Sequence, residues 1–363
     1  MLKRATALLL AGASVSAWLG CGTTNSRFLF AAIPTSSNIV AYREDPNSGV
    51  LTQLSGSPIS AGQGVEALVL HPSGKFLYAA NSGSNNISLY TISSTGGLTE
   101  VTPRATTGTS PTLMVMDSGG TFLYVANSGS NDISVFSVGS DGKLAPVSQC
   151  LSSLPCNATT AQIGLSAMNM ALAPSGNFLY VTGQPIQQGG LIEVFPVSQG
   201  VLGVPVSGPF LTGNIPLGLA IDSTGSFLYT SNKQDNSISP FAINADGSLT
   251  AVGSAIGETN SGPVSLLIDK SGKYLYVANQ GSSNTAAYGI GTDGGLTLIS
   301  GSPFTTGSGP NILASDSSGK YFFVGFSSGL QSFQLDSGSG TLSSVASYTI
   351  SAAGTPTSIV ITP

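Results

Sequence analysis

Only a few side chains in this 363-residue sequence could take part in acid–base or electrostatic catalysis. Charged residues make up 7% of the chain, and His71 is its single histidine. A carboxylate such as Glu66 or Glu258 could act as a general base, and a cation such as Arg104 could stabilise the negative charge that develops on a carbonyl oxygen. Whether these groups meet depends on the elements that carry them.

Those elements follow from an internal repeat. GKFLYAANSGSNNISLYTI, residues 74–92, returns 46 residues later as GTFLYVANSGSNDISVFSV. Aromatic triplets mark seven copies, spaced 46 to 56 residues apart, which begin at Phe28, Phe76, Phe122, Phe178, Phe227, Tyr274 and Tyr321. A Gly-x-Leu turn also recurs seven times, beginning at Gly49, Gly96, Gly142, Gly200, Gly247, Gly294 and Gly340. The period suits four strands per copy, which is the size of a propeller blade.

Each copy reads as four strands, called A to D, such as residues 67–71, 76–81, 87–92 and 97–101. One such sheet buries too little apolar surface to be stable alone, so seven should pack face to face around an axis. We therefore expect an all-β fold, a single seven-bladed β-propeller with four-stranded blades, over residues 27–363. Residues 357–362 resemble a strand A that no strand B follows, so this C-terminal strand should pair with residues 27–32 and close the ring.

Propeller geometry sorts the candidate residues by face. The D-to-A and B-to-C loops lie on one face, called the top, and the first residues of strands A should line its central mouth. These residues are Glu66, Thr112, Leu217, Val264, Asn311 and Thr357. Glu66 is the single carboxylate among them, and we expect Glu258 and Arg104 in neighbouring top loops. One hypothesis makes Glu66 the base and Arg104 its electrostatic partner; the alternative is a solvated rim of charges without a catalytic role.

Other polar residues of the repeat have simpler interpretations. His71 stands where other copies have Asp117, Asp222, Asp269 and Asp316, which open the A-to-B turn, so we expect a turn residue on the bottom face. The B-to-C loops 81–86, 127–132, 232–236 and 279–284 are rich in Asn, Ser and Gly. These residues are typical of turns, where Asn and Gly accept left-handed backbone conformations. The alternative is that the loops form a rim that binds a glycan or a peptide. A small molecule, a glycan or an envelope protein could bind the top face, with Glu66, Thr112, Glu258, Asn311 and Thr357 as candidate contacts.

The N-terminus predicts export. Lys3 and Arg4 precede an apolar run over residues 5–20, which has the length of a signal-peptide core and is short for a membrane span. We assign residues 1–20 to a lipoprotein-type signal peptide and 21–26 to a short tether. Trp18-Leu19-Gly20-Cys21 resembles a lipobox, so Cys21 should carry lipid; cleavage after Ala17 is the alternative. The expected location is the periplasm or the cell surface, with this anchor as the only membrane contact.

Composition excludes several classes of partner. The formal net charge is −5 and no Lys/Arg stripe is present, which excludes nucleic-acid binding.

Apart from Cys21, the cysteines are Cys150 and Cys156. Such a pair predicts a disulfide in an exported chain, with two free thiols as the alternative. A single distant histidine argues against a metal site. We expect a monomer without a cofactor.

The GKFLYVAN-like phrase at residues 74–81, 120–127 and 272–279 resembles the YVTN-type repeat. Together with the HPSGK turn at residues 71–75 and the Gly-x-Leu hairpins, it makes residues 26–363 resemble the lactonase family of seven-bladed propellers, which includes 6-phosphogluconolactonases. The resemblance implies ring opening by base-activated water, with cationic groups holding an anionic substrate. In this sequence five lysines fall in turns of the bottom face: Lys75, Lys143, Lys270, Lys273 and Lys320. This leaves mainly Arg104 and Lys233 as cations of the top face. We therefore expect a binding or scaffold module of the cell envelope, with lactone hydrolysis at the top mouth as the alternative.

Overall fold

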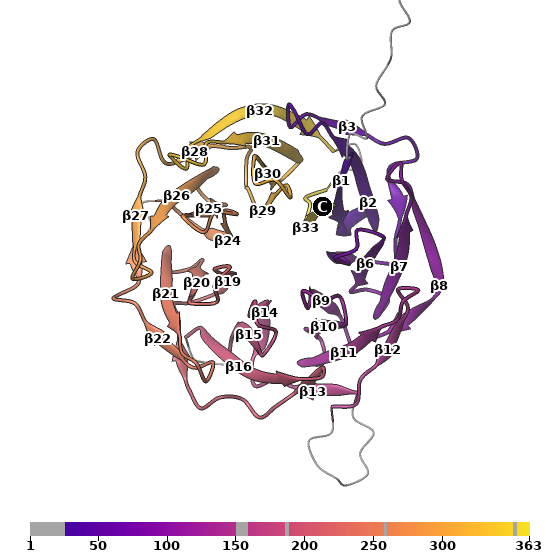
Figure 1. The fold of residues 1–363 in the computed structure, drawn as a ribbon, viewed down its shortest axis with the longest axis horizontal. Coiled ribbons are helices and arrows are strands. Elements are labelled where there is room, and N and C mark those ends of the chain that lie inside the picture. Colours follow the sequence, from indigo (N-terminus) through magenta and orange to yellow (C-terminus); the bar gives the residue numbers. More distant parts are fainter. Residues whose placement is uncertain (1–25, 150–158, 186–188, 258–259, 351–353) are drawn as a thin grey trace, which may run out of the picture.

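The computed structural model describes residues 26–149, 159–185, 189–257, 260–350 and 354–363. Cys21, Cys150, Cys156 and Glu258 therefore lie outside the described residues. Seven small sheets surround a common axis, and in each blade one edge strand of the sheet lies nearest the axis (Figure 1). The one helical element in the described ranges is a single 3-10 turn, η1 (Pro34–Ser36). The described residues therefore contain no helix that is long and apolar enough to cross a membrane.

The strands follow the repeat from blade to blade. Blade 1 comprises β33 (Ser358–Ile361), β1 (Arg27–Ile33), β2 (Asn38–Glu44), β3 (Leu51–Gln53) and β4 (Ile59–Ser60); blade 2 comprises β5 (Val65–Leu70), β6 (Phe76–Asn81), β7 (Asn86–Ile92) and β8 (Leu98–Thr106). Blade 3 comprises β9 (Pro111–Met116), β10 (Phe122–Asn127), β11 (Asp132–Val138), β12 (Leu144–Pro146) and β13 (Thr160–Gln162); blade 4 comprises β14 (Ser166–Leu172), β15 (Phe178–Gln184), β16 (Leu191–Ser198), β17 (Val201–Leu202) and β18 (Phe210–Leu211). Blade 5 comprises β19 (Pro216–Ile221), β20 (Phe227–Asn232), β21 (Ser237–Ile243), β22 (Leu249–Ala251) and β23 (Ile256–Gly257). Blade 6 comprises β24 (Pro263–Ile268), β25 (Tyr274–Asn279), β26 (Asn284–Ile290), β27 (Leu296–Leu298) and β28 (Phe304–Thr305); blade 7 comprises β29 (Ile312–Ser315), β30 (Tyr321–Phe326), β31 (Gly329–Leu335) and β32 (Leu342–Thr349).

The seven-bladed all-β fold is confirmed, and the outer edge of the blades is more varied than expected. Only blades 2 and 7 have four strands. In the other five blades strand D is divided into two short segments that pair with the same strand C, as β3 and β4 do with β2. In blades 1, 4 and 6 a proline, such as Pro58 in blade 1, lies just before the second segment. Proline donates no hydrogen bond to a ladder, which is tolerated at a sheet edge.

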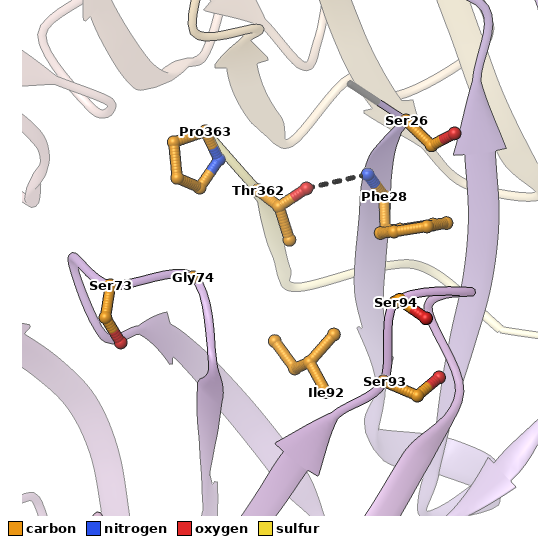
Figure 2. A pocket seen from close by; sticks show the side chains of 9 residues that line it. All are labelled: Ser26, Phe28, Ser73, Gly74, Ile92, Ser93, Ser94, Thr362 and Pro363. Atoms are coloured by element: carbon orange, nitrogen blue, oxygen red, sulfur yellow. Dashed lines mark hydrogen bonds between the residues drawn. The ribbon is translucent and has the colours of Figure 1, made fainter. Parts of the chain in front are cut away.

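The predicted ring closure is also confirmed. β33 pairs antiparallel with β1, in a register that places Leu29 opposite Ile361 and Ala32 opposite Ser358. Beyond the paired residues, the Thr362 hydroxyl accepts a hydrogen bond from the Phe28 amide at 2.9 Å (Figure 2). The first blade is therefore completed by the last strand of the chain, which couples the two ends of the fold.

The hydrophobic core lies between the blades. Strand B is buried on both sheet faces, as in β6, where five consecutive residues after Phe76 are buried. One cluster joins Phe30 and Ile39 of blade 1 to Leu68 and Leu77 of blade 2, and equivalent clusters recur around the ring. Burial on both faces explains why these strands have nearly continuous apolar runs rather than an alternating pattern.

A contact between an aromatic ring and a glycine joins every pair of neighbouring blades. A Cβ added to Gly142 would lie 2.7 Å from the Phe76 ring, and Gly142 has φ +80°. The same arrangement pairs Tyr321 with Gly49, Phe28 with Gly96, Phe122 with Gly200, Phe178 with Gly247, Phe227 with Gly294 and Tyr274 with Gly340. Each ring opens the aromatic triplet of one blade, and each glycine lies in the C-to-D turn of the next. Glycine is needed there for two reasons: it adopts the positive φ without strain, and it has no side chain to collide with the ring.

The third residue of the triplet strengthens the same contact. The Tyr78 hydroxyl donates to the Gly142 carbonyl at 2.7 Å, and Tyr276 does the same for Gly340 at 2.7 Å. Tyr180 and Tyr229 repeat the bond to Gly247 and Gly294. Burial raises the pKa of Tyr180 to about 12, so its hydroxyl stays protonated and remains a donor.

We predict that Gly142→Ala lowers the free energy of unfolding by about 2–4 kcal/mol, because a left-handed backbone and a clash with Phe76 add together. Gly176→Ala is the matched control, since Gly176 has φ +75° with no atom within 4 Å of the added Cβ. It should cost only about 1 kcal/mol. Urea denaturation measures both, and equal losses would mean that the ring contact contributes nothing.

A buried charge cluster lies at the closure of the ring. The Arg27 guanidinium is 2.6 Å from the Asp316 carboxylate and 3.5 Å from that of Glu44. Glu44 is only 1% exposed. Burial, together with the nearby Asp316, raises the pKa of Glu44 to about 7 despite the opposing effect of Arg27.

Stability should therefore depend on pH in a defined window. Between about pH 4.5 and 7 the folded protein keeps a proton on Glu44 that the unfolded chain releases, so the free energy of unfolding falls as the pH rises, by up to about 3 kcal/mol. Urea denaturation across this window should show the slope in the wild type and lose most of it in Glu44→Gln. Asp141→Asn, an exposed carboxylate in another blade, should retain it. A slope of unchanged size in Glu44→Gln would assign the titration to another group.

Candidate functional site

A cavity of about 400 Å³ lies on the axis, where the seven innermost strands begin. The cavity is lined by all six residues predicted at the mouth: Glu66, Thr112, Leu217, Val264, Asn311 and Thr357. The innermost strands of neighbouring blades contact one another around the whole ring, so the wall is continuous. The volume is in the range of small-molecule sites in proteins.

A β-bulge places the lining residue in five blades. In blade 2 the pairing of β5 with β6 shifts between Val65 and Ala67, which leaves Glu66 without a partner across the ladder. Thr112, Met168, Leu217 and Val264 occupy the same bulged position in blades 3 to 6. A bulge redirects one side chain out of the regular alternation of a strand, and such bulges are common beside active sites. In blades 7 and 1, Asn311 and Thr357 directly precede the strand.

Met168 completes this ring of seven and was missed from the sequence. In five copies a proline precedes the lining residue and marks its position, as Pro111 does for Thr112. Blade 4 has Ala167 there, and the spacing from the preceding aromatic triplet is the longest in the chain. Alignment on the following triplet, Phe178–Tyr180, would have found Met168.

Hydrogen bonds between blades fix the cavity wall. The Thr357 hydroxyl donates to the Glu66 carbonyl at 2.7 Å, and the Leu68 amide donates to the Ser358 hydroxyl at 3.0 Å. The Asn311 side-chain amide donates to the Pro356 carbonyl at 2.5 Å. The closing strand β33 therefore holds the strand that carries Glu66, so an intact ring and a positioned carboxylate depend on each other.

Glu66 and Lys233 are the charged side chains among the described residues that line the cavity. Glu66 is half-buried, and burial raises the pKa of its carboxyl above the ordinary value. Lys233 follows β20 in blade 5, and its ammonium donates to the Gln280 side chain of blade 6 at 2.8 Å. An ammonium has three N–H donors, so Lys233 keeps others for a ligand.

Arg104 does not belong to this site. It was expected in a top loop near Glu66, but it lies within β8, the outer strand of blade 2, and does not line the cavity. Its guanidinium binds the Glu100 carboxylate at 2.6 Å on the same strand. The error has a structural cause, because strand D of blade 2 runs unbroken through residues that the repeat assigned to a loop. Glu258, the other predicted neighbour, lies outside the described residues.

His71 is a bottom turn residue, as the repeat alignment predicted. It directly follows β5, and its ring nitrogens lie 2.8 Å from the Ser73 hydroxyl and 3.2 Å from the Gly120 carbonyl. Its ring also packs edge-on against Phe76. The imidazole thus joins the turns of blades 2 and 3, on the face opposite the cavity.

A second cavity of about 440 Å³ lies on the bottom face between blades 1 and 2, beside the last residues of the chain (Figure 2). Its lining includes the hydroxyl groups of Ser26, Ser73, Ser93 and Ser94, and no charged side chain. The Ser73 hydroxyl has a base beside it, the Nδ1 of His71 at 2.8 Å, but that nitrogen also accepts a hydrogen bond from the Ser73 amide. The described lining has no cationic side chain that could stabilise the negative charge on an attacked carbonyl. In the described parts of the chain no group of three or more His, Cys, Asp or Glu side chains could hold a metal ion. The axial cavity is therefore the better candidate for chemistry.

Fold and cavity together describe a seven-bladed propeller with a cavity of small-molecule size on its axis. The sequence model of the lactonase, seven-bladed β-propeller family matches residues 55–158 and 212–304, more than half of the chain. The chain belongs to this family. No curated protein matches it closely enough in sequence to be counted as a relative.

Solved structures share the fold at low identity. A Bacteroides fragilis protein with the provisional name 6-phosphogluconolactonase has a TM-score of 0.78 and 20% identity, over 94% of this chain and 99% of that one. The periplasmic gluconolactonase of Pseudomonas aeruginosa has a TM-score of 0.76 and 19% identity, over 93% and 99%. Hydrazine synthase of Kuenenia stuttgartiensis also matches, with a TM-score of 0.61 and 15% identity over 89% and 95%. Such distant likeness establishes the fold and leaves the reaction to the site.

Proposed function

We propose that this protein hydrolyses a lactone in the axial cavity, with Glu66 as the general base. The observation that carries the proposal is the single half-buried carboxylate of the described cavity lining, whose pKa is raised by burial. A carboxylate with a raised pKa is a stronger base for water. Family membership and the two similar propellers named as lactonases support hydrolysis over the binding or scaffold role expected from the sequence.

The reaction needs only groups that line the cavity, together with water. The Glu66 carboxylate takes a proton from water while the water oxygen attacks the carbonyl carbon of the lactone. The negative charge that forms on the carbonyl oxygen is stabilised by the N–H donors of Lys233 that Gln280 does not use. The ring C–O bond then breaks, the leaving oxygen receives the proton, and the product is a hydroxy acid.

We predict that Glu66→Gln lowers kcat/KM on a panel of δ-lactones by about 10²–10⁴, the usual contribution of a general base. In the wild type kcat/KM should fall as the pH drops through a value above the ordinary pKa of glutamate, because only the ionised Glu66 accepts a proton. The panel contains glucono-δ-lactone, its 6-phosphate and δ-valerolactone, and turnover is measured above spontaneous hydrolysis.

Glu193→Gln is the matched control. Glu193 is also half-buried with a pKa raised by burial, but it lies on β16 outside the cavity lining. Its substitution should leave turnover intact. A blank across the panel from wild-type protein that unfolds cooperatively would contradict hydrolysis. It would favour the second candidate, a ligand-binding module, which is supported by the absence of imidazole and guanidinium groups from the described lining.

We further propose that the protein acts outside the cytoplasm on a lipid anchor at Cys21. The support is the basic Lys3 and Arg4, the apolar run that follows, and the lipobox-like Trp18-Leu19-Gly20-Cys21. Lipidation at the mature N-terminus would leave the tether 21–26 between the membrane and β1.

We predict that Cys21→Ser moves the protein from the membrane fraction to the soluble fraction and abolishes labelling by a fatty-acid analogue. Mass spectrometry of the wild-type N-terminal peptide should show a lipidated Cys21. A mature N-terminus at Trp18 without lipid would contradict the anchor and support cleavage after Ala17.

A further inference from the structure

We propose that the axial cavity selects an uncharged lactone with an apolar substituent, and that the substituent lies against a wall of methionines in blades 3 and 4. This inference rests on the proposed lactone hydrolysis and names the substrate class of that site. Its basis is the unequal distribution of polar and apolar side chains around an axis that the backbone makes nearly symmetric.

The ring of seven lining residues divides into two continuous arcs. In blade order from blade 7 through blades 1, 2 and 3, its residues are Asn311, Thr357, Glu66 and Thr112, all polar. From blade 4 through blade 6 they are Met168, Leu217 and Val264, all apolar. At the level of this ring a ligand therefore meets hydrogen-bonding groups on one side and hydrocarbon or thioether on the other, while Asn169, Lys233, Ser265 and Gln280 add polar groups to the lining from blades 4 to 6.

Methionine is concentrated on one side of the cavity. The sequence has five methionines, and Met114, Met168 and Met170 line the cavity from β9 and β14, which are neighbours in the ring. Met116 is also on β9 but is not part of the lining. Methionine side chains are flexible and polarizable, and they adapt to apolar ligands of different shape. Here they form a wall suited to a hydrocarbon substituent.

The two charged groups orient a lactone relative to this wall. Glu66 reaches the cavity from blade 2 and Lys233 from blade 5, so a carbonyl between base and cation has blades 3 and 4 on one side. The methionines occupy that side together with Thr112, and Val264, Asn311 and Thr357 occupy the other. A substituent on the lactone ring can then contact the methionines while the ester group remains between Glu66 and Lys233.

The same groups disfavour a phosphorylated substrate. Phosphate recognition usually needs several cationic donors, and arginine pairs are the strongest. The described lining offers one ammonium, which already donates to Gln280, and it places a carboxylate in the same cavity. A doubly charged phosphate in this partly buried space would be poorly compensated.

The test compares δ-valerolactone, δ-octalactone and δ-decalactone, which differ only in alkyl chain, with 6-phosphoglucono-δ-lactone. We expect kcat/KM to rise about threefold to fourfold for each methylene until the wall is covered, and the phosphorylated lactone to be the poorest substrate. Met168→Gln, which keeps side-chain length but adds polarity, should reduce the ratio of δ-decalactone to δ-valerolactone by about tenfold. Met116→Gln should leave that ratio unchanged.

A binding measurement separates this inference from the proposed function. Calorimetry with 6-pentyl-2-piperidinone, a lactam of the same shape that resists hydrolysis, should show binding to wild-type protein that Met168→Gln weakens. Lactone turnover without dependence on chain length, or with preference for the phosphate, would overturn the inference and leave hydrolysis standing. Lactam binding that depends on Met168, without turnover of any lactone, would uphold the apolar wall and overturn hydrolysis. Absence of both would overturn both.

Discussion

The ring depends on one repeated contact, in which an aromatic side chain of each blade packs on a glycine in the next. The contact occurs at all seven blade boundaries, including the boundary of blades 7 and 1, where Tyr321 meets Gly49. Because the glycine has a positive φ and the ring lies against its Cα, a side chain at the glycine would be strained, and a smaller residue in place of the ring would leave a void. In four boundaries a buried tyrosine hydroxyl also binds the glycine carbonyl. These contacts lie at the C-to-D turns, on the face away from the cavity.

Because the ring contacts and the cavity lie on opposite faces, the bulged lining residues can vary without disturbing the contacts between aromatic rings and glycines. Five of the cavity's lining residues sit at bulges, where the side chain is not part of a regular cross-strand pair. A substitution at Glu66 or Met168 therefore alters the chemistry of the cavity with little effect on the contacts between blades. It is consistent with this separation that proteins of similar fold include both a gluconolactonase and hydrazine synthase.

The sequence predicted the ring well because the fold is built from a repeat. Seven aromatic triplets fixed the number of blades, and an unpaired strand A at the C-terminus fixed the closure between β33 and β1. The register also placed six of the seven residues that form the ring of the cavity lining, since one strand position faces the axis in every blade. It failed where a copy departs from the pattern. Met168 lacks the preceding proline, and Arg104 lies in a D strand that is unbroken in blade 2.

What the repeat could not predict is the difference between blades, and chemistry depends on that difference. A perfectly sevenfold cavity would offer the same group from every side and could not orient an asymmetric substrate. Here the scaffold residues stay nearly constant, while the bulge position varies from glutamate to methionine within three blades. Glu66, the single carboxylate of the described lining, gives the cavity one side with a base, and the methionines give it one apolar side. Lys233 lies in a loop and not in the ring of seven lining residues, and it adds a cation at another point of the cavity. A nearly symmetric fold therefore carries a cavity whose sides differ in charge and polarity, which is what an asymmetric substrate needs in order to bind in one orientation.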